Sequence, residues 1–440
     1  MSGNRLECRS AEECVAAASQ LREAQRPGAD IDAIIERIFE RVRNEGDRSL
    51  FDLTEEFDGV KLKKLRLDTE EMKALASDVD GEVLEALKMA SSNIRQFHLG
   101  GHPAGVVLQF DGSRIERKYV PLGRVGIYVP GGKYAYPSTV LMAAIPARIA
   151  GVTDMVLFTP PDKDGKRLRY VAAACLLSGI SSIVTVGGAQ AIAAMAYGTE
   201  SIRKVDMIVG PGNSYVAKAK AAVSSLGLTG IDSIAGPTEI LALADRSAGG
   251  DEDVVAYELL AQMEHGSGAS AVLCSDSAEL IDGVIGRMHD IVDLARRSVL
   301  TGCLQNFTSV LVSSPELMEA FAEEYAPEHL FAVGDEAERI AEGVRNSGSV
   351  FIGRCSSVAF GDYISGTNHI LPTMGTARFS SPLQVTNFMK VVERQRLSRI
   401  TAEKLSAPGS KLAESEGLFK HAACMKLRGR MPGTEVGSDE

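Results

Sequence analysis

The sequence has no tryptophan, and aromatic residues make up only 5% of its 440 residues. Aromatic platforms for stacked bases are therefore not expected, and a net charge of −11 argues further against a nucleic-acid partner. No uncharged apolar run is long enough to span a membrane. The first residues, MSGNRLECRSAEEC, lack the apolar core of a signal peptide. These absences predict a cytoplasmic protein that binds neither nucleic acid nor membrane.

Several sequence motifs are also missing. The seven cysteines contain no CxxC pair and follow no regular spacing, which favours reduced thiols over a disulfide framework. No GxGxxG fingerprint follows a strand, and no HExxH motif is present. Neither a standard dinucleotide loop nor a compact metal motif can therefore be read from spacing alone.

The length and the remaining composition indicate a globular protein of more than one domain. A chain of 440 residues is too long for one small core. Apolar residues at 45% and charged residues at 24% are typical of such a protein.

The order of the expected elements favours an α/β fold. Apolar residues at helical spacing between 31 and 42 predict an amphipathic helix, and charged helical sequence continues to about residue 96. From about residue 119, short β-branched runs alternate with alanine-rich helical segments, and after residue 237 the alternation resumes. Strand and helix in repeated alternation predict parallel sheets, so we expect two α/β units in series. Beyond about residue 379 the sequence turns helical and polar, and such an extension often wraps another subunit, so we expect an obligate dimer.

Three glycine-rich turns stand where a strand gives way to a helix. They are YVPGG (128–132), VGGAQ (186–190) and VGPGN (209–213). That edge of an open α/β sheet commonly binds ligands, and helix N-termini there favour phosphate. The alternative, three tight turns that need glycine for their backbone geometry, stays open.

Histidines are few, and four of the seven lie in polar clusters after residue 260. Each stands close to an amide or a carboxylate: His265 with Gln262, His329 with Glu328, His369 with Asp362, and His421 with Glu416. Imidazole, carboxylate and amide groups are plausible ligands for zinc or a similar ion. Any single one of them can equally be a structural histidine.

The run APEHL suggests proton transfer. Glu328 and His329 are adjacent, so their side chains leave the backbone in different directions and could serve two separate proton transfers. The alternative is the end of a helix followed by a strand, with both side chains exposed.

A series of longer motifs resembles one enzyme family. YVPGG, GGAQAIAAMAYGTESIRKVDMIVGPGN, GIDSIAGPTE, QMEHG, APEHL, GSVFIG and GDYISGTNHILPTMGTARFSSPL occur in this order. Over essentially its full length the chain resembles histidinol dehydrogenase. The family oxidises L-histidinol through L-histidinal to L-histidine and reduces two NAD at one zinc site.

The resemblance implies a role for each matching residue. Its zinc ligands, one Zn²⁺ per subunit, match Gln262, His265, Asp362 and His421, and the last reaches across a homodimer. Its catalytic pair matches Glu328 and His329, with histidine taking the alcohol proton and glutamate activating water for the second oxidation. Its NAD contacts match Tyr128, Gln190 and Asn213, and its other substrate contacts match Thr238, His369 and Glu416.

The resemblance also implies a division of the chain. We expect an N-terminal helical segment (1–29), a catalytic and metal-binding α/β domain (30–120 and 239–379), an NAD domain (121–238) and a C-terminal helical arm (380–440) that crosses to the partner. The two sheet units are expected to be incomplete Rossmann-like folds in an intertwined dimer.

Two positions depart from the family pattern. Thr238 stands where many members have serine, and it keeps the hydroxyl. Lys133 stands where a small residue is expected, and it could anchor an anionic substrate. A related enzyme acting on another small alcohol such as sulfopropanediol is thus an alternative, and a non-catalytic, zinc-stabilised binding protein is a second.

Overall fold

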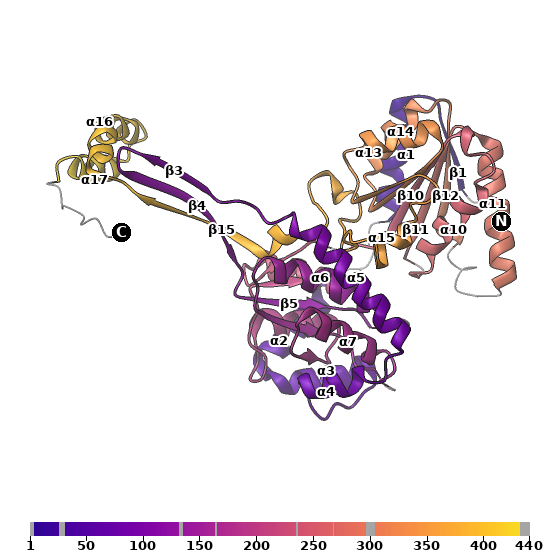
Figure 1. Ribbon diagram of the computed structural model, residues 1–440, viewed down its shortest axis with the longest axis horizontal. Helices are drawn as coiled ribbons and strands as arrows, with labels where there is room; N and C mark the ends of the chain where they lie inside the picture. Colours follow the sequence, from indigo (N-terminus) through magenta and orange to yellow (C-terminus); the bar gives the residue numbers. More distant parts are fainter. Residues whose placement is uncertain are drawn as a thin grey trace. The chain divides into compact units, whose positions relative to one another are not determined.

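The computed structural model describes residues 4–25, 31–131, 135–162, 165–234, 236–266, 268–295 and 304–431. They fall into two units. Unit 1 comprises residues up to Gly101 together with Leu122–Phe388, and unit 2 comprises His102–Pro121 together with residues from Met389 onward. Each unit is built around its own sheets (Figure 1).

Sheet A of unit 1 has six parallel strands in the order β1-β12-β11-β10-β13-β14. The strands are β1 (Asn4–Cys8), β10 (Glu239–Ala244), β11 (Ser270–Ser275), β12 (Phe307–Val312), β13 (His329–Val333) and β14 (Ser349–Ile352). Its helices are α1 (Ala11–Ala24), α10 (Glu252–Met263), α11 (Ala278–Ala295), α13 (Glu316–Tyr325), α14 (Asp335–Gly343) and α15 (Val358–Tyr363).

The central strand of sheet A shows why the sheet is buried on both faces. Successive side chains of a strand point to opposite faces. In β10, Ile240, Ala242 and Ala244 join the core beneath α10 and α11, whereas Leu241 and Leu243 join the core beneath α1, α13 and α14. The apolar run EILALA therefore fills two cores, as expected for a parallel sheet.

Sheet B of unit 1 has the order β2-β7-β6-β5-β8-β9 and is parallel except for the short β2–β7 pair. The strands are β2 (Arg66–Leu67), β5 (Arg124–Tyr128), β6 (Asp154–Phe158), β7 (Ile183–Val184), β8 (Met207–Val209) and β9 (Gly230–Ile231). Its helices are α2 (Asp32–Glu45), α3 (Asp47–Asp58), α4 (Thr69–Ala76), α5 (Gly81–Leu99), α6 (Pro137–Ile149), α7 (Leu168–Ser178), α8 (Gly188–Tyr197) and α9 (Ser214–Ser225).

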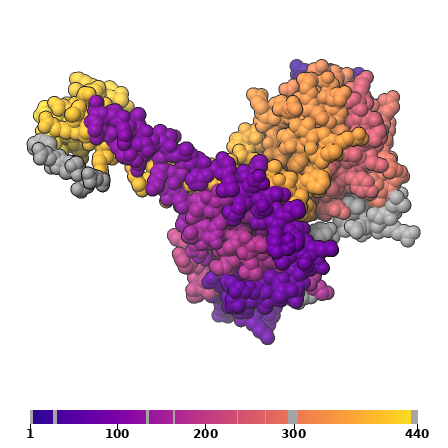
Figure 2. Space-filling model, in the orientation of Figure 1, coloured from indigo at the N-terminus to yellow at the C-terminus, as the bar shows by residue number. Residues whose placement is uncertain are grey.

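Unit 2 is an antiparallel three-stranded sheet with two helices. The strands β15 (Met389–Arg396), β4 (Ser113–Pro121) and β3 (Val106–Phe110) lie in that order, and α16 (Arg399–Ser415) and α17 (Phe419–Arg428) follow β15. Segments far apart in the sequence thus share one surface, as the purple and yellow atoms of this unit show in Figure 2.

The structure confirms an α/β fold with parallel sheets but groups the segments differently from the expected domains. The first residues form a strand, β1, which pairs with β12, so 1–29 is not a purely helical segment. Residues 31–99 pack with sheet B rather than with sheet A: β2 pairs with β7, and Ile35 and Phe39 of α2 lie in the sheet B core. The C-terminal arm begins with strand β15, not with a helix. In each case a pairing with a distant strand overrides the local pattern.

Within the described residues no helix is both long and apolar enough to cross a membrane.

Candidate active site

The glycine-rich turns lie at the carboxyl edge of sheet B. β6 and β7 extend to one side of β5 and β8 and β9 to the other, so the strand order reverses between β5 and β8, the position at which open α/β sheets bind ligands. Tyr128 ends β5 and Gly210 follows β8, so both flank this position. Sheet B therefore presents its carboxyl edge to a ligand.

Glycine is required in these turns for packing. Gly210 has φ +117°, and a Cβ there would lie 2.0 Å from the carbonyl oxygen of Tyr128. A Cβ at Gly187 would lie 2.3 Å from Pro160. These glycines are therefore needed for tight turns, and the same turns also line cavities.

The adjacent pair Glu328 and His329 lies at the opposite edge, the amino edge, of sheet A. His329 is the first residue of β13, and Glu328 precedes it after the end of α13. In sheet A the strand order reverses between β10 and β13. At the carboxyl edge this position is occupied by the Asp245 side chain, which accepts the Glu336 and Ala337 amides at 2.9 and 2.8 Å. The alternative of an exposed pair is wrong, since both side chains are buried.

A cavity of about 300 Å³ in unit 1 brings the two edges together. Its walls include the VGPGN turn of sheet B with the predicted residue Asn213, and six further predicted site residues: Thr238, His265, Glu328, His329, Asp362 and His369. Residues as far apart in the sequence as Pro130 and Thr373 thus meet around one space.

Two further cavities hold the other predicted residues of unit 1. One of about 290 Å³ is lined by Gln262, His265 and Asp362. Another of about 610 Å³ is lined by Tyr128, Gln190 and Asn213, and Asn213 also lines the cavity of the catalytic pair. Glu416 and His421 lie in unit 2, where both are exposed. Lys133 lies outside the described residues.

Glu328 is a buried carboxyl with its oxygens held in place. Its Oε2 accepts the Thr238 hydroxyl at 2.6 Å and the Glu239 backbone amide at 2.9 Å. Burial raises its pKa to about 7, against the opposing charge of His329 and these hydrogen bonds. A carboxyl with this pKa can take up and release a proton near neutral pH.

His329 lies between two carboxylates. Nδ1 is 3.2 Å from the Glu239 carbonyl oxygen and 3.6 Å from Glu328. Nε2 is buried, lies 3.4 Å from Asp362 Oδ1 and has no aligned hydrogen-bond partner. Burial lowers the pKa of His329, but the charges of Glu328 and Asp362 outweigh it and raise the pKa to about 9. If Nδ1–H donates to the carbonyl, Nε2 is the nitrogen left free to exchange a proton with a bound molecule.

The residues predicted to hold a metal have suitable protonation states. Burial acts to raise the pKa of Asp362, but attraction to the His329 imidazole, 3.4 Å away, outweighs this and lowers it. His265 is exposed on the rim of its cavities, yet desolvation by their walls lowers its pKa. Gln262 donates through Nε2 to Thr238, which leaves Oε1 for a cation. An ionised carboxylate, a neutral imidazole and an amide oxygen suit zinc.

In the part of the chain that the structure describes, no group of three His, Cys, Asp or Glu side chains is placed to hold a metal. Of the predicted ligands, unit 1 contains two such side chains, His265 and Asp362, and the amide Gln262. A tetrahedral zinc site would need one more ligand.

His369 bridges the two halves of unit 1. Its Nε2 is 3.0 Å from the Thr139 hydroxyl of α6, and its Nδ1 is 2.7 Å from the Asp362 carbonyl oxygen. Burial lowers the pKa of this imidazole. The neutral ring can thus fix the loop after α15 against the wall of the cavity.

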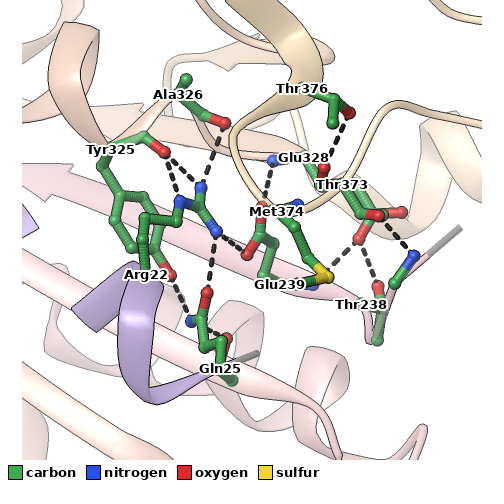
Figure 3. Close-up of polar contacts among 12 residues, drawn as sticks. Arg22, Gln25, Thr238, Glu239, Tyr325, Ala326, Glu328, Thr373, Met374 and Thr376 are labelled. Atoms are coloured by element: carbon green, nitrogen blue, oxygen red, sulfur yellow. Dashed lines mark hydrogen bonds and ion pairs between the residues drawn. The ribbon is translucent and has the colours of Figure 1, made fainter. Parts of the chain in front are cut away.

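Two charged residues beside the catalytic pair have no predicted role: Glu239 and Arg22. Glu239 is 1% exposed and begins β10, and Arg22 of α1 forms a short ion pair with it (Figure 3). The sequence signal for Glu239 is an acidic residue at the start of the otherwise apolar strand EILALA. For Arg22 there is no comparable signal.

The family model and the curated relatives that match this chain indicate the same family. The family model described as histidinol dehydrogenase matches residues 21–429. Histidinol dehydrogenase from Methanothermobacter thermautotrophicus is 42% identical over 411 residues, which are 92% of this chain and 95% of the relative. That from Geobacillus kaustophilus is 44% identical over 399 residues, 89% and 92% of the two chains.

Solved structures agree. The crystal structure of histidinol dehydrogenase from Elizabethkingia anophelis superposes with a TM-score of 0.89 at 34% identity, covering 97% of this chain and 98% of that chain. An oxidoreductase from Marinobacter aquaeolei shares the fold at a TM-score of 0.50 and 12% identity, covering 88% of this chain and 90% of that chain.

Proposed function

This chain belongs to the histidinol dehydrogenase family, and from this premise we propose that it oxidises L-histidinol through L-histidinal to L-histidine at the cavity around Glu328 and His329. It is an NAD-dependent oxidoreductase of histidine biosynthesis. The observation that carries the proposal is the convergence of a buried glutamate–histidine pair and a glycine-rich sheet edge on one cavity. The names of the relatives do not favour the sulfonated diol or the non-catalytic alternative.

We propose that NAD lies along the carboxyl edge of sheet B, which would make this half the Rossmann-like unit. Tyr128, Gln190 and Asn213 line the cavity of about 610 Å³ there. Tyr128 accepts the Gly188 amide at 3.1 Å, so its ring is fixed beside the start of α8. Asn213 lines both cavities and would stand where cofactor and substrate meet.

We propose Gln262, His265 and Asp362 as zinc ligands, with His421 of a second copy as the fourth. When bound, zinc would hold the amine and the imidazole of the substrate, and NAD would accept the hydride. Thr238, His369 and Glu416 are proposed to contact the substrate. Thr238 is tied to both Gln262 and Glu328 by hydrogen bonds, so its hydroxyl links the metal side of the site to the catalytic pair.

His329 is proposed as the base of the hydride-transfer steps. Its free Nε2 takes the alcohol proton as the carbon–hydrogen bond breaks. A cation held by Asp362 would neutralise one of the two carboxylates that raise the pKa of His329. The ring would then return toward the neutral form that a base needs.

Glu328 is proposed to activate the water that attacks the aldehyde. The Thr238 hydroxyl and the Glu239 amide both donate to Oε2, so Oε1 is left to take a proton from water. The resulting hydrate is an alcohol again, and the second oxidation repeats the first, with His329 taking the hydroxyl proton. Two oxidations at one site thus need these two kinds of proton transfer.

We propose that the enzyme is a homodimer with shared sites. Residues 102–121 and 389–431 contain 13 Lys and Arg against six Asp and Glu, although the whole chain has a net charge of −11. Unit 2 also exposes large apolar side chains, among them Val106, Leu412 and Phe419. A basic unit with exposed apolar residues is suited to an acidic, partly apolar surface, and unit 1 of a second copy carries the opposite charge.

The activity is tested by incubating the purified protein with NAD and L-histidinol and following the absorbance of the reduced cofactor. Two NADH per histidinol are expected. No NADH, or a higher kcat/KM with the sulfonated diol, would refute the proposed function.

Sharing of the site is tested with hybrid dimers of His421→Ala and Glu328→Gln chains. If His421 serves the other subunit, each hybrid regains one intact site, and random mixing returns about a quarter of the wild-type rate with L-histidinal, the step that Glu328→Gln loses. If His421 serves its own chain, mixing restores nothing.

A further inference from the structure

The turn that carries the catalytic pair is held from behind by Arg22. This side chain comes from α1, more than 300 residues earlier, and its guanidinium is largely buried. Nε donates to the Tyr325 carbonyl oxygen at 2.7 Å, and Nη2 donates to the Ala326 carbonyl oxygen at 3.0 Å. The guanidinium carbon also lies 3.7 Å from the centre of the Tyr325 ring, a cation–π geometry (Figure 3).

This turn has a backbone conformation that needs support. Ala326 has φ +47°, in the left-handed region that residues with a side chain rarely adopt, and it lies two residues before Glu328. Such a conformation is unfavourable by itself and persists only where its surroundings fix it. The two carbonyl groups that Arg22 holds belong to this residue and to the one before it.

Glu239 connects Arg22 to the catalytic pair. Its carboxylate pairs with the guanidinium through Oε2, and its Oε1 accepts the Glu328 backbone amide at 3.2 Å and the Met374 amide at 3.1 Å. Its backbone amide donates to the Glu328 carboxylate, and its backbone carbonyl faces His329 Nδ1. One residue thus contacts both the backbone and the side chain of Glu328, and it also fixes the ring of His329.

We propose that Arg22 and Glu239 are positioning residues, which hold Glu328 and His329 in the orientation that the two oxidations require. Neither lines the cavity of about 300 Å³, so they act through the catalytic pair. This inference rests on the proposed function, because the pair must carry the proton transfers for its orientation to matter.

The test compares Arg22→Met, Arg22→Lys and Glu239→Gln with the wild type in each half-reaction. Arg124→Met is the matched control, since it breaks another partly buried arginine–carboxylate pair, with Asp154, at the amino end of β5. Arg22→Met should lower kcat for L-histidinal about a hundredfold, the scale expected for a misplacement of about 1 Å. The KM for NAD should stay at the wild-type value.

The conservative variant separates charge from position. Arg22→Lys keeps the charge beside Glu239 but cannot bind the two carbonyl groups as a planar guanidinium does. It should therefore fold better than Arg22→Met, and kcat should remain low. If Arg22→Met does not fold, this variant still tests the proposal.

Glu239→Gln tests the electrostatic link. The groups that face the Glu328 carboxyl are the Glu239 carboxylate, the His329 ring and the Thr238 hydroxyl, and the charge of Glu239 acts to raise the pKa of Glu328. The midpoint of the pH profile for L-histidinal oxidation should therefore fall in this variant. A residue with only a structural role would lower stability without moving the midpoint.

The outcomes distinguish a failure of the proposed function from a failure of the positioning role. A wild type that does not oxidise L-histidinol refutes the proposed function. An active wild type, together with Arg22→Lys and Glu239→Gln variants that match Arg124→Met in kcat and in pH midpoint, refutes the positioning role alone.

Discussion

Replacing Glu328 by glutamine should slow the oxidation of L-histidinal far more than that of L-histidinol. The amide has nearly the same shape and can still accept the Thr238 hydroxyl, but it cannot take a proton from water. Loss of a general base typically costs about a hundredfold to ten-thousandfold in rate. The first oxidation, which relies on His329, should remain measurable.

The structure also sets the pH dependence that the variant should lose. Burial raises the pKa of Glu328 to about 7. A base works in its ionised form, so the active fraction is about one tenth at pH 6 and about nine tenths at pH 8. The wild-type rate for L-histidinal should thus rise about tenfold across this range. Without the burial, the carboxyl would be ionised throughout this range, and Glu328 would add no pH dependence to the rate.

The assay is a single-turnover measurement of reduced cofactor, with L-histidinal and saturating NAD, between pH 5.5 and 8.5. Asp245→Asn is the matched control, because Asp245 is another buried carboxylate of sheet A but lies at the opposite edge of that sheet. It should lose stability and keep the pH profile. A Glu328→Gln protein that oxidises L-histidinal at the wild-type rate, or a wild-type rate that is flat from pH 6 to 8, would show that this glutamate is not the water-activating base.

Three further variants test the neighbouring parts of the site. Lys220→Met leaves Asp232 buried without its counter-ion and should lower the free energy of unfolding by about 3–5 kcal/mol, measured by denaturant titration. Adding Asp232→Asn should recover much of this loss of stability, and no recovery would argue against the ion pair as the cause. Gly210→Ala places a Cβ against the Tyr128 carbonyl at positive φ, and the strain should weaken NAD binding about tenfold or more in calorimetry; unchanged affinity would separate this turn from the cofactor. His265→Ala removes a proposed neutral ligand, so metal analysis should find less than stoichiometric zinc, and full zinc content would contradict its assignment.

Much of unit 1 could be predicted from the sequence, because its strands are buried on both faces. Runs such as MVLF, ILALA and LFAV are apolar without interruption, and each lies in a strand where the pattern indicated one. The glycine turns were visible for the same reason, since they stand between such a run and a helix.

The grouping of segments could not be predicted, because it depends on pairings that no local pattern records. β1 has only five residues and joins sheet A through β12. β2 has only two residues, and its pairing with β7, like the packing of α2 and α3 into the sheet B core, joins segments far apart in the sequence. Of the residues around Glu328, the acidic Glu239 left a trace in the sequence as a charge in an apolar strand. Arg22 left none, because an arginine near the end of a helix is usually a solvated one.

The pairing of β1 with β12 has a consequence for how the enzyme is made. β1 leaves the ribosome long before its partner, which begins at Phe307. At about 5–20 residues per second, the strand waits roughly 15–60 s before that partner has been synthesised. Arg22 waits longer still, since the carbonyl groups that it holds belong to Tyr325 and Ala326. The chain therefore completes its catalytic turn only when its beginning returns to join its second half, so a nascent chain stalled before that point has sheet B but no working site.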